Sequence, residues 1–290
     1  MVGKRARGGR VSVAVKLLIA LALAFAAAVY DSNTRIDVAE YTLRFGNLPA
    51  SFDGLRIASL SDVHAAQFGK NNEKLIAAVV RARPDIIALT GDLIDDTGQL
   101  GIIDTLVGGL ADIAPVYYVT GNHEWDSGDM RNLQSLLEQR GVTVLRNAYI
   151  PLTISGESVV LAGTDDPNGP SDMVKPEKFI EDIRRAEGDK FLIVLEHRNN
   201  HLEMYSSLGV DLIICGHAHG GIVRLPFTDG LVGPSREILP TYTNGVYTAG
   251  ATSMLVSRGV GNHTGYPRFL NNPHIPVAVL RRSAIRVETK

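Results

Sequence analysis

The chain of 290 residues contains one cysteine, Cys215, and one tryptophan, and only 6% of its residues are aromatic. A single thiol excludes an intramolecular disulfide framework and any thiolate zinc finger. An excess of one charge is also lacking, since 29 basic and 31 acidic side chains leave a formal net charge of −2. This balance disfavours a disordered charged protein and a general nucleic-acid-binding surface. No specific nucleic-acid partner is therefore expected.

The charge is unevenly distributed along the chain. Residues 1–16 hold five basic side chains and no acidic one, whereas residues 17–290 hold 24 basic and 31 acidic side chains, a net charge of −7. Residues 17–30 carry no charge and are rich in leucine and alanine. This pattern is typical of a cleaved secretory signal, with Ala26 to Ala28 as the cleavage site, or of an uncleaved anchor counted from Val11. We favour the anchor and count it from Val11, because residues 17–30 alone are short for a membrane span.

Both interpretations place the following domain outside the cytoplasm, because the basic residues lie on the N-terminal side of the apolar segment. The protein is expected in the cytoplasmic membrane with this domain on the extracytoplasmic face, or exported if the segment is cleaved. The predicted organisation is a basic cytoplasmic flank (1–16), a transmembrane anchor or signal segment (17–30), a strand with a short linker (31–54) and one large domain (55–290).

Short apolar runs alternate with helical patterns in the body of the chain. Strands are predicted at 36–45, 55–60, 86–89, 116–119, 158–162, 191–195 and 211–215, and helices at 72–83, 102–110 and 129–139. Residues 246–287 are predicted to form several β segments separated by Gly and Pro turns, which indicates a second or extended sheet. Such alternation predicts a layered α/β domain.

Polar clusters follow five of these strands. Their sequences are Asp62-Val63-His64, Gly91-Asp92-Leu93-Ile94-Asp95, Gly121-Asn122-His123-Glu124, Glu196-His197 and Gly216-His217-Ala218-His219. Ligands of open α/β sheets bind outside the carboxyl ends of the strands, so we expect the clusters to converge. Each cluster alone is weak evidence, but together they contain five of the eight histidines.

The residue types in these clusters predict a metal site. Asp, Asn and His bind hard to borderline divalent cations, and a site without thiolates agrees with the single cysteine. Glycine precedes Asp92, Asn122 and His217. A glycine at the end of a strand allows a sharp turn and a close approach of the backbone, which we expect at these three positions.

Taken in order, the series Asp-x-His, Gly-Asp-x-x-Asp, Gly-Asn-His-Glu, His and Gly-His-x-His resembles the signature of the calcineurin-like metallophosphoesterases, from about Leu55 to the C-terminus. Residues 216–226 and 257–261 are similar to the bacterial membrane-anchored or exported phosphodiesterase-like branch. The resemblance implies an α/β fold, a four-layer αββα sandwich of two mixed β-sheets, with residues 55–290 as the catalytic domain. Two departures, Arg198-Asn199-Asn200 after His197 and Ile222 after Gly221, remove no ligand but line the expected substrate approach.

The resemblance also implies two divalent metal ions, Mn, Fe or Zn. One ion would be bound by Asp62, His64, Asp92 and His219, and the other by Asp92, Asn122, His197 and His217. A shared Asp92 and a bridging hydroxide would reduce the repulsion between the two ions, and the hydroxide would be the nucleophile. His123 would act as the general acid, oriented by Asp95. Glu124 is expected to support its loop rather than to bind metal.

These implications predict a two-metal phosphoester hydrolase, with phosphodiesterase activity as the main hypothesis. Its partners would be the membrane, through the N-terminal segment, and a phosphodiester or pyrophosphate substrate. A lipid-linked nucleotide-sugar pyrophosphatase is the alternative, because a short tether would hold the site near the bilayer. A non-catalytic metal-binding scaffold is a more remote alternative, disfavoured because every expected ligand is present.

The remaining polar residues match no position of these motifs. His201, His263 and His274 are interpreted as ordinary surface or loop residues, and Asp165-Asp166-Pro167 as a turn. Arg198 is interpreted as a solvated side chain, with contact to a substrate phosphate as the alternative.

Overall fold

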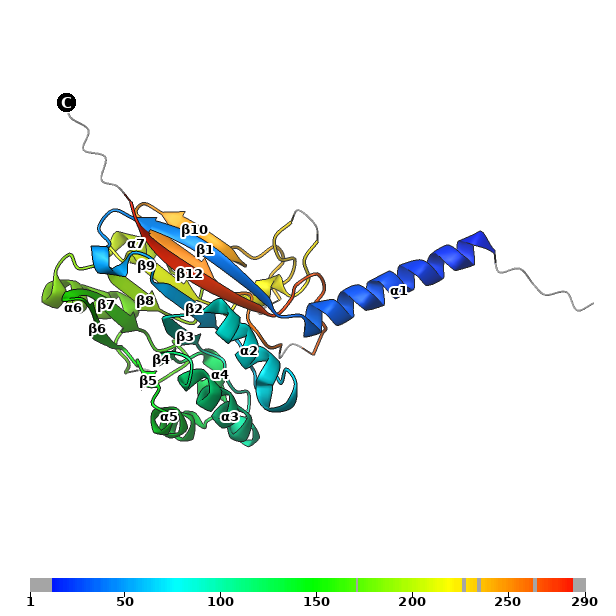
Figure 1. Cartoon of the computed structure of the whole chain (residues 1–290), viewed down its shortest axis with the longest axis horizontal. Coiled ribbons are helices and arrows are strands. Elements are labelled where there is room, and N and C mark those ends of the chain that lie inside the picture. The colour runs from blue at the N-terminus through cyan, green and yellow to red at the C-terminus, as the bar shows by residue number, and fades with distance from the viewer. Residues whose placement is uncertain (1–11, 171, 226–227, 234–235, 263–264, 284–290) are drawn as a thin grey trace, which may run out of the picture.

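The computed structural model describes residues 12–170, 172–225, 228–233, 236–262 and 265–283. Most of the predicted basic flank and His263 therefore lie outside the described residues. Two six-stranded mixed sheets lie face to face, and helices cover their outer sides (Figure 1). This arrangement confirms the predicted αββα sandwich.

The first sheet has the strand order β1-β12-β2-β3-β4-β5. Its strands are β1 (Asp37–Phe45), β2 (Arg56–Leu60), β3 (Ile86–Thr90), β4 (Val116–Val119), β5 (Thr143–Val144) and β12 (His274–Arg282). Strands β2 to β5 are parallel, while β12 is antiparallel to β2 and parallel to β1. The segment between the apolar helix and the domain thus supplies an edge strand of the sheet.

The second sheet has the order β10-β11-β9-β8-β7-β6. Its strands are β6 (Ala148–Ile154), β7 (Glu157–Gly163), β8 (Leu192–Leu195), β9 (Leu212–Cys215), β10 (Gly245–Ala249) and β11 (Thr252–Val256). The four central strands are parallel, and β6 and β10 form antiparallel edges. The β segments predicted after residue 246 are divided between the sheets, because β12 crosses back into the first one.

Three apolar cores hold the layers together. The core between the sheets joins Ile57 and Ala88 of the first sheet to Ile193 and Leu195 of the second. The outer face of the first sheet packs against α2 (Glu73–Ala82), α3 (Leu100–Ala111) and α5 (Met130–Gln139), and that of the second against α6 (Pro176–Glu187) and α7 (Leu202–Ser207). Burial on both faces explains why the central strands read as uninterrupted apolar runs.

The helix α1 (Val13–Thr34) extends away from the sandwich (Figure 1). Among the described residues it is the one helix long and apolar enough to cross a membrane. It has 22 residues, which corresponds to about 33 Å at 1.5 Å per residue and matches the hydrocarbon thickness of a bilayer. The helix starts within the predicted basic flank and continues beyond the predicted apolar segment.

Candidate metal centre

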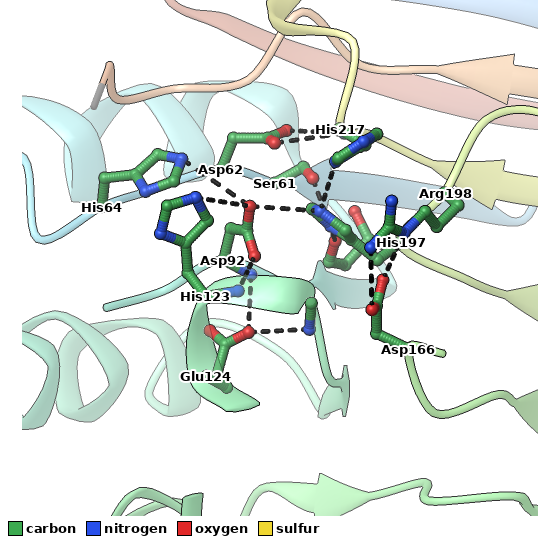
Figure 2. A network of polar contacts seen from close by, with 12 residues as sticks. Ser61, Asp62, His64, Asp92, His123, Glu124, Asp166, His197, Arg198 and His217 are labelled. Atoms are coloured by element: carbon green, nitrogen blue, oxygen red, sulfur yellow. Dashed lines mark hydrogen bonds and ion pairs between the residues drawn. The ribbon is translucent and has the colours of Figure 1, made fainter. Parts of the chain in front are cut away.

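The five polar clusters converge where the carboxyl ends of both sheets meet. Loops after β2 and β3 carry Asp62, His64, Asp92 and Asp95, and α4 (Asn122–Asp126) begins directly after β4. Loops after β8 and β9 carry His197, His217 and His219. Figure 2 shows side chains from both sheets pointing toward one another around Asp92. The convergence expected for these clusters is therefore present.

Three groups of ligand-type side chains have donor atoms within 4.8 Å of one another. They comprise Asp62, His64, Asp92 and His219; Asp92, His197 and His217; and His64, Asp95 and His123. The first two groups share Asp92 and contain six of the seven residues predicted to bind metal. The seventh, Asn122, has a buried Oδ1 atom without a hydrogen-bond partner among the described residues. A buried amide oxygen of this kind fits a cation, which would satisfy it.

The carboxylate of Asp92 lies at the centre of this arrangement. Its Oδ2 atom is 3.1 Å from Nε2 of His197, 3.9 Å from Nε2 of His64 and 4.0 Å from Nε2 of His123. Its Oδ1 atom accepts a hydrogen bond of 2.9 Å from the backbone N–H of His123. Only 1% of Asp92 is exposed. One buried carboxylate therefore faces imidazoles from both sheets.

The outer nitrogens of the imidazoles are held by oxygen atoms behind the centre. Nδ1 of His64 lies 2.7 Å from Oδ1 of Asp95, and Nδ1 of His197 lies 2.8 Å from the carbonyl oxygen of Thr90. With a cation bound, each oxygen would accept the Nδ1 proton of a neutral imidazole and leave the Nε2 lone pair directed toward the centre. Asp95 also lies 2.9 Å from Nδ1 of His123. It thus orients two histidines, whereas the sequence predicted this role for His123 alone.

The loops that carry the predicted ligands approach one another closely at the glycines that precede Asp92, Asn122 and His217, as the sequence predicted. A Cβ atom on Gly121 would lie 2.2 Å from Oδ1 of Asp92, and one on Gly216 would lie 2.5 Å from Oδ2 of Asp62. On Gly91, which has a φ of +83°, it would lie 2.6 Å from the nitrogen of Gly121. No side chain larger than hydrogen fits at these positions, so the three loops can meet only through glycine.

The backbone is also strained at the predicted ligands. Five of them adopt a positive φ, namely Asp62 (52°), His64 (46°), Asp92 (55°), His217 (65°) and His219 (47°). Such conformations cost about 1–3 kcal/mol each for residues other than glycine and cluster at functional sites. Glu124 supports its own loop, as expected, because its carboxylate accepts a hydrogen bond from the backbone N–H of Gly121. It also accepts from the backbone N–H groups of Asp92 and Leu93, and so ties this loop to the loop after β3.

The electrostatics of the centre favour bound positive charge. Burial raises the pKa of Asp62, and burial with the charge of Asp92 raises the pKa of Glu124 to about 7. For His197, burial lowers the pKa, but the charge and hydrogen bond of Asp92 outweigh burial and raise it to about 10. Burial and the neighbouring His197 lower the pKa of His217 to about 2. The raised pKa values of Asp62, Glu124 and His197 mean that these buried groups hold protons more tightly than free side chains do, and bound divalent cations can supply that positive charge instead.

The interpretations of two residues outside the predicted centre, Arg198 and His274, require correction. Arg198 is not a free solvated side chain: its Nε donates to Oδ2 of Asp166 at 2.7 Å and its Nη2 to Oδ1 at 3.1 Å, beside His197 (Figure 2). The turn predicted at Asp165-Asp166-Pro167 is present, because the backbone N–H of Gly169 donates to the carbonyl oxygen of Asp166 at 3.0 Å, and Asp166 is buried. His274 is fully buried at the start of β12, not on a surface or loop. Sequence spacing gave no sign of these contacts, because each joins distant parts of the chain.

An αββα sandwich whose strand ends hold buried carboxylates, imidazoles and an amide has the donor set of a metal-binding α/β protein. The family described as calcineurin-like phosphoesterase matches residues 55–221, more than half of the chain. The chain belongs to this family and is a metal-dependent phosphoester hydrolase, which disfavours the scaffold hypothesis. The resemblance inferred from the motifs is confirmed.

Several curated relatives align over most of the chain. It is 28% identical to the uncharacterized metallophosphoesterase YkuE of Bacillus subtilis, over 85% of this chain and 86% of that protein. It is also 28% identical to the phosphodiesterase YaeI of Escherichia coli, over 72% and 76% of the two chains. A Danio rerio transmembrane protein with a metallophosphoesterase domain is 25% identical over 73% of this chain, which spans about half of that relative (53%).

Proposed function

We propose that the protein is a two-metal phosphodiesterase. The observation that carries this proposal is the position of Asp92, whose Oδ2 atom faces His197, His64 and His123 within 4.0 Å. The same carboxylate belongs to two groups of ligand-type atoms. A carboxylate shared between two donor sets is what a pair of dications needs, because it lies between them and reduces their repulsion.

Two sets of residues would hold the ions. The first set is Asp62, His64, Asp92 and His219, and the second is Asp92, Asn122, His197 and His217. Mixed oxygen and imidazole donors suit Mn, Fe or Zn. Bound ions would supply Lewis acidity, which neutralises phosphoryl oxygens and makes water a nucleophile at neutral pH.

His123 is proposed as the general acid of the reaction. Its side chain is 20% exposed, whereas those of His64 and His197 are at most 1% exposed, so it can reach the leaving oxygen of a substrate. Asp95 accepts the Nδ1 proton at 2.9 Å and leaves Nε2 as the group that donates. Burial lowers the pKa of His123, but Asp95 and Asp92 outweigh burial and raise it, which keeps the acid protonated.

A phosphodiester is the proposed substrate, and a membrane is the proposed location. The substrate class is supported by the printed name of YaeI, a phosphodiesterase. Anchoring by an uncleaved α1 is supported by its length and apolarity and by the transmembrane relative. The basic residues before α1 support an extracytoplasmic catalytic domain. Intact mass of the membrane-extracted protein tests whether the N-terminus is retained.

A lipid-linked pyrophosphate is a second candidate substrate. The observation that favours it is that Nδ2 of Asn271 donates to the carbonyl oxygen of His219, while neighbouring Asn272 bonds to Asp31 of α1. The predicted ion site is therefore tied to the end of the domain from which α1 leaves. Activity on detergent-solubilised lipid pyrophosphates without activity on soluble diesters would favour this candidate.

The proposed function is tested with the full chain purified in detergent and loaded with Mn²⁺, Fe²⁺ or Zn²⁺. We expect close to two ions per chain and hydrolysis of bis(p-nitrophenyl) phosphate. His217→Ala should lower the metal content toward one ion and reduce turnover. His201→Gln is the matched control, because His201 follows the same strand as His197 but bonds to Glu196 rather than to the centre.

Two results would contradict the proposal. The first is a chain that binds two ions and cleaves phosphomonoesters but no diester or pyrophosphate, which would overturn the substrate class. The second is a His217→Ala variant with unchanged metal content and turnover, which would overturn the ligand assignment.

A further inference from the structure

Exposed apolar side chains gather at the end of the domain next to α1. Outside α1, eight large apolar residues are exposed among the described residues, and five of them lie in the loops 222–244 and 262–273. These five are Leu225 (44% exposed), Ile238 (83%), Leu239 (66%), Tyr266 (69%) and Leu270 (42%). We call this set the apolar rim. Figure 1 shows the described parts of both loops beside the base of α1.

The two loops are joined to each other and to α1. Val223 and Phe269 form a parallel bridge, and the backbone N–H of Arg224 donates to the carbonyl oxygen of Phe269 at 3.0 Å. The ring of Phe269 stacks on Phe25 of α1 with centroids 5.2 Å apart. Asn33 both donates to and accepts from the backbone of Arg268, at 2.9 and 3.1 Å. The apolar rim is therefore held at a defined height along α1.

That height corresponds to the boundary region of a bilayer. Asp31 is the first charged residue after the apolar segment of α1, and Phe25 precedes it by six residues. Six helical residues span about 9 Å, so Phe25 lies about 9 Å below Asp31 toward the membrane interior. Interfacial protein elements bury their apolar faces about 5–10 Å into the boundary of headgroups and acyl chains. A loop whose Phe269 stacks on Phe25 must reach the same depth.

We propose that the apolar rim is a membrane-docking surface, and that it inserts into the outer boundary of the bilayer that holds α1. The composition fits this occupant, because Leu and Ile would enter the acyl region and Tyr266 would lie at the level of the headgroups, where tyrosine is enriched. Exposure of 83% for Ile238 and 66% for Leu239 would otherwise leave these side chains in water. Docking fixes the orientation of the domain, which a single helix leaves free to rotate.

The consequence for the enzyme follows from the contacts of Asn271. Its Nδ2 atom donates to the carbonyl oxygens of His219 at 2.8 Å and of Ile222 at 3.1 Å. The loop that carries a predicted metal ligand is thus the same loop that leads into the apolar rim. Docking would hold the metal centre at the lipid surface, where phosphodiesters and pyrophosphates carried by lipids present their headgroups. This inference rests on α1 being in a membrane, not on the outcome of the activity assay.

Fluorescence quenching in vesicles tests the proposal on the full chain. Leu239→Cys and Leu270→Cys are labelled with a polarity-sensitive fluorophore and reconstituted in phosphatidylcholine–phosphatidylglycerol vesicles that contain lipids with a nitroxide on the upper acyl chain. Cys215 is fully buried, so the introduced cysteine is the thiol that reacts. Leu21→Cys on α1 is the positive control, and Asp189→Cys in the turn after α6 is the negative control.

We expect both labels in the apolar rim to be quenched several-fold more strongly than the label at residue 189. Quenching at residue 21 together with rim labels that behave like residue 189 would overturn the rim proposal and leave the anchor intact. In that case, cross-linked dimers through residue 239 would assign the surface to a second copy of the chain. Absence of quenching at residue 21 would overturn the anchor and the rim proposal together. None of these readouts depends on turnover.

Discussion

The two sheets contribute different chemistry to the candidate metal centre. Loops after β2 and β3 of the first sheet supply the carboxylates Asp62 and Asp92, whereas loops after β8 and β9 of the second sheet supply only imidazoles among the predicted ligands. Each predicted ion site draws on both sheets. A bound cation would therefore act as a cross-link between the layers, in addition to the apolar core that already joins them. The carboxylate charge of the centre therefore comes from the first sheet, whereas both sheets supply the imidazoles that would position the ions.

Removal of the carboxylate that both predicted ion sites share should have the largest effect. Asp92→Asn should lower kcat/KM for bis(p-nitrophenyl) phosphate on the order of 10³-fold, since an amide neither carries charge nor bridges two cations well. Steady-state kinetics and metal analysis of the folded variant measure the effect. Asp104→Asn is a matched control, because Asp104 forms an exposed ion pair with Arg140 on the outer helices. Loss of less than about tenfold on Asp92→Asn would contradict its central role.

Removal of the cations should weaken the link between the sheets. At a free metal concentration of 100 times the dissociation constant, one ion stabilises the folded state by about 2.7 kcal/mol. Chelation should therefore lower the thermal unfolding midpoint in detergent, because the folded state loses the free energy of ion binding. The Asp92→Asn variant should show a much smaller shift. An equal shift in both proteins would mean that the ions bind elsewhere.

The sequence predicted the layers of the fold better than their edges. Parallel central strands such as β3 and β9 are buried on both faces, so their apolar runs identify them directly. The strand β6 and the helices α6 and α7 were not predicted, although Phe179, Ile180 and Ile183 give α6 a buried face with helical spacing. The helix α7 has six residues, too few to show a helical period. The return of β12 into the first sheet between β1 and β2 depends on long-range pairing, which no local pattern reveals.

The same distinction applies to the candidate site. Its members could be listed from the sequence because each follows an apolar strand, and glycine marks the turns at Gly91, Gly121 and Gly216. The contacts of these residues could not be listed. Asp95 bonds to His64 as well as His123, and Asp166 pairs with Arg198 across 32 positions of sequence. Such partners are fixed by the packing of loops from different strands, not by spacing along the chain.

Asp95 contacts both His64 and His123, so its removal should disturb a predicted metal ligand and the proposed general acid together. Asp95→Asn should reduce turnover about 10–100-fold, the usual cost of losing a group that orients a metal ligand. If Asp95 also holds His123 as a general acid, the loss should be greater for diesters with poor leaving groups than for nitrophenyl diesters. Kinetics across a series of leaving groups measure this difference. Asp96→Asn is the control, because Asp96 caps the next turn by accepting from Gly98.

The outcome separates the two roles of Asp95. A loss that is uniform across leaving groups and accompanied by lower metal content would show that Asp95 acts through His64 alone. A leaving-group dependence with unchanged metal content would assign its effect to His123.

The smallest expected effect concerns a polar pair at the end of β8 that lies outside the predicted ion sites. Nδ1 of His201 lies 3.0 Å from Oε2 of Glu196, and this hydrogen bond raises the pKa of His201 above its ordinary value of 6.5. A raised pKa in the folded state adds stability that is complete below pH 6.5 and is lost as the pH rises through the folded value. His201→Gln should therefore cost less than about 1 kcal/mol near pH 5.5 and less still near pH 9. Denaturant unfolding at both pH values measures the difference. A cost that does not change with pH would mean that the imidazole of His201 stabilises the fold by packing and not by its charge.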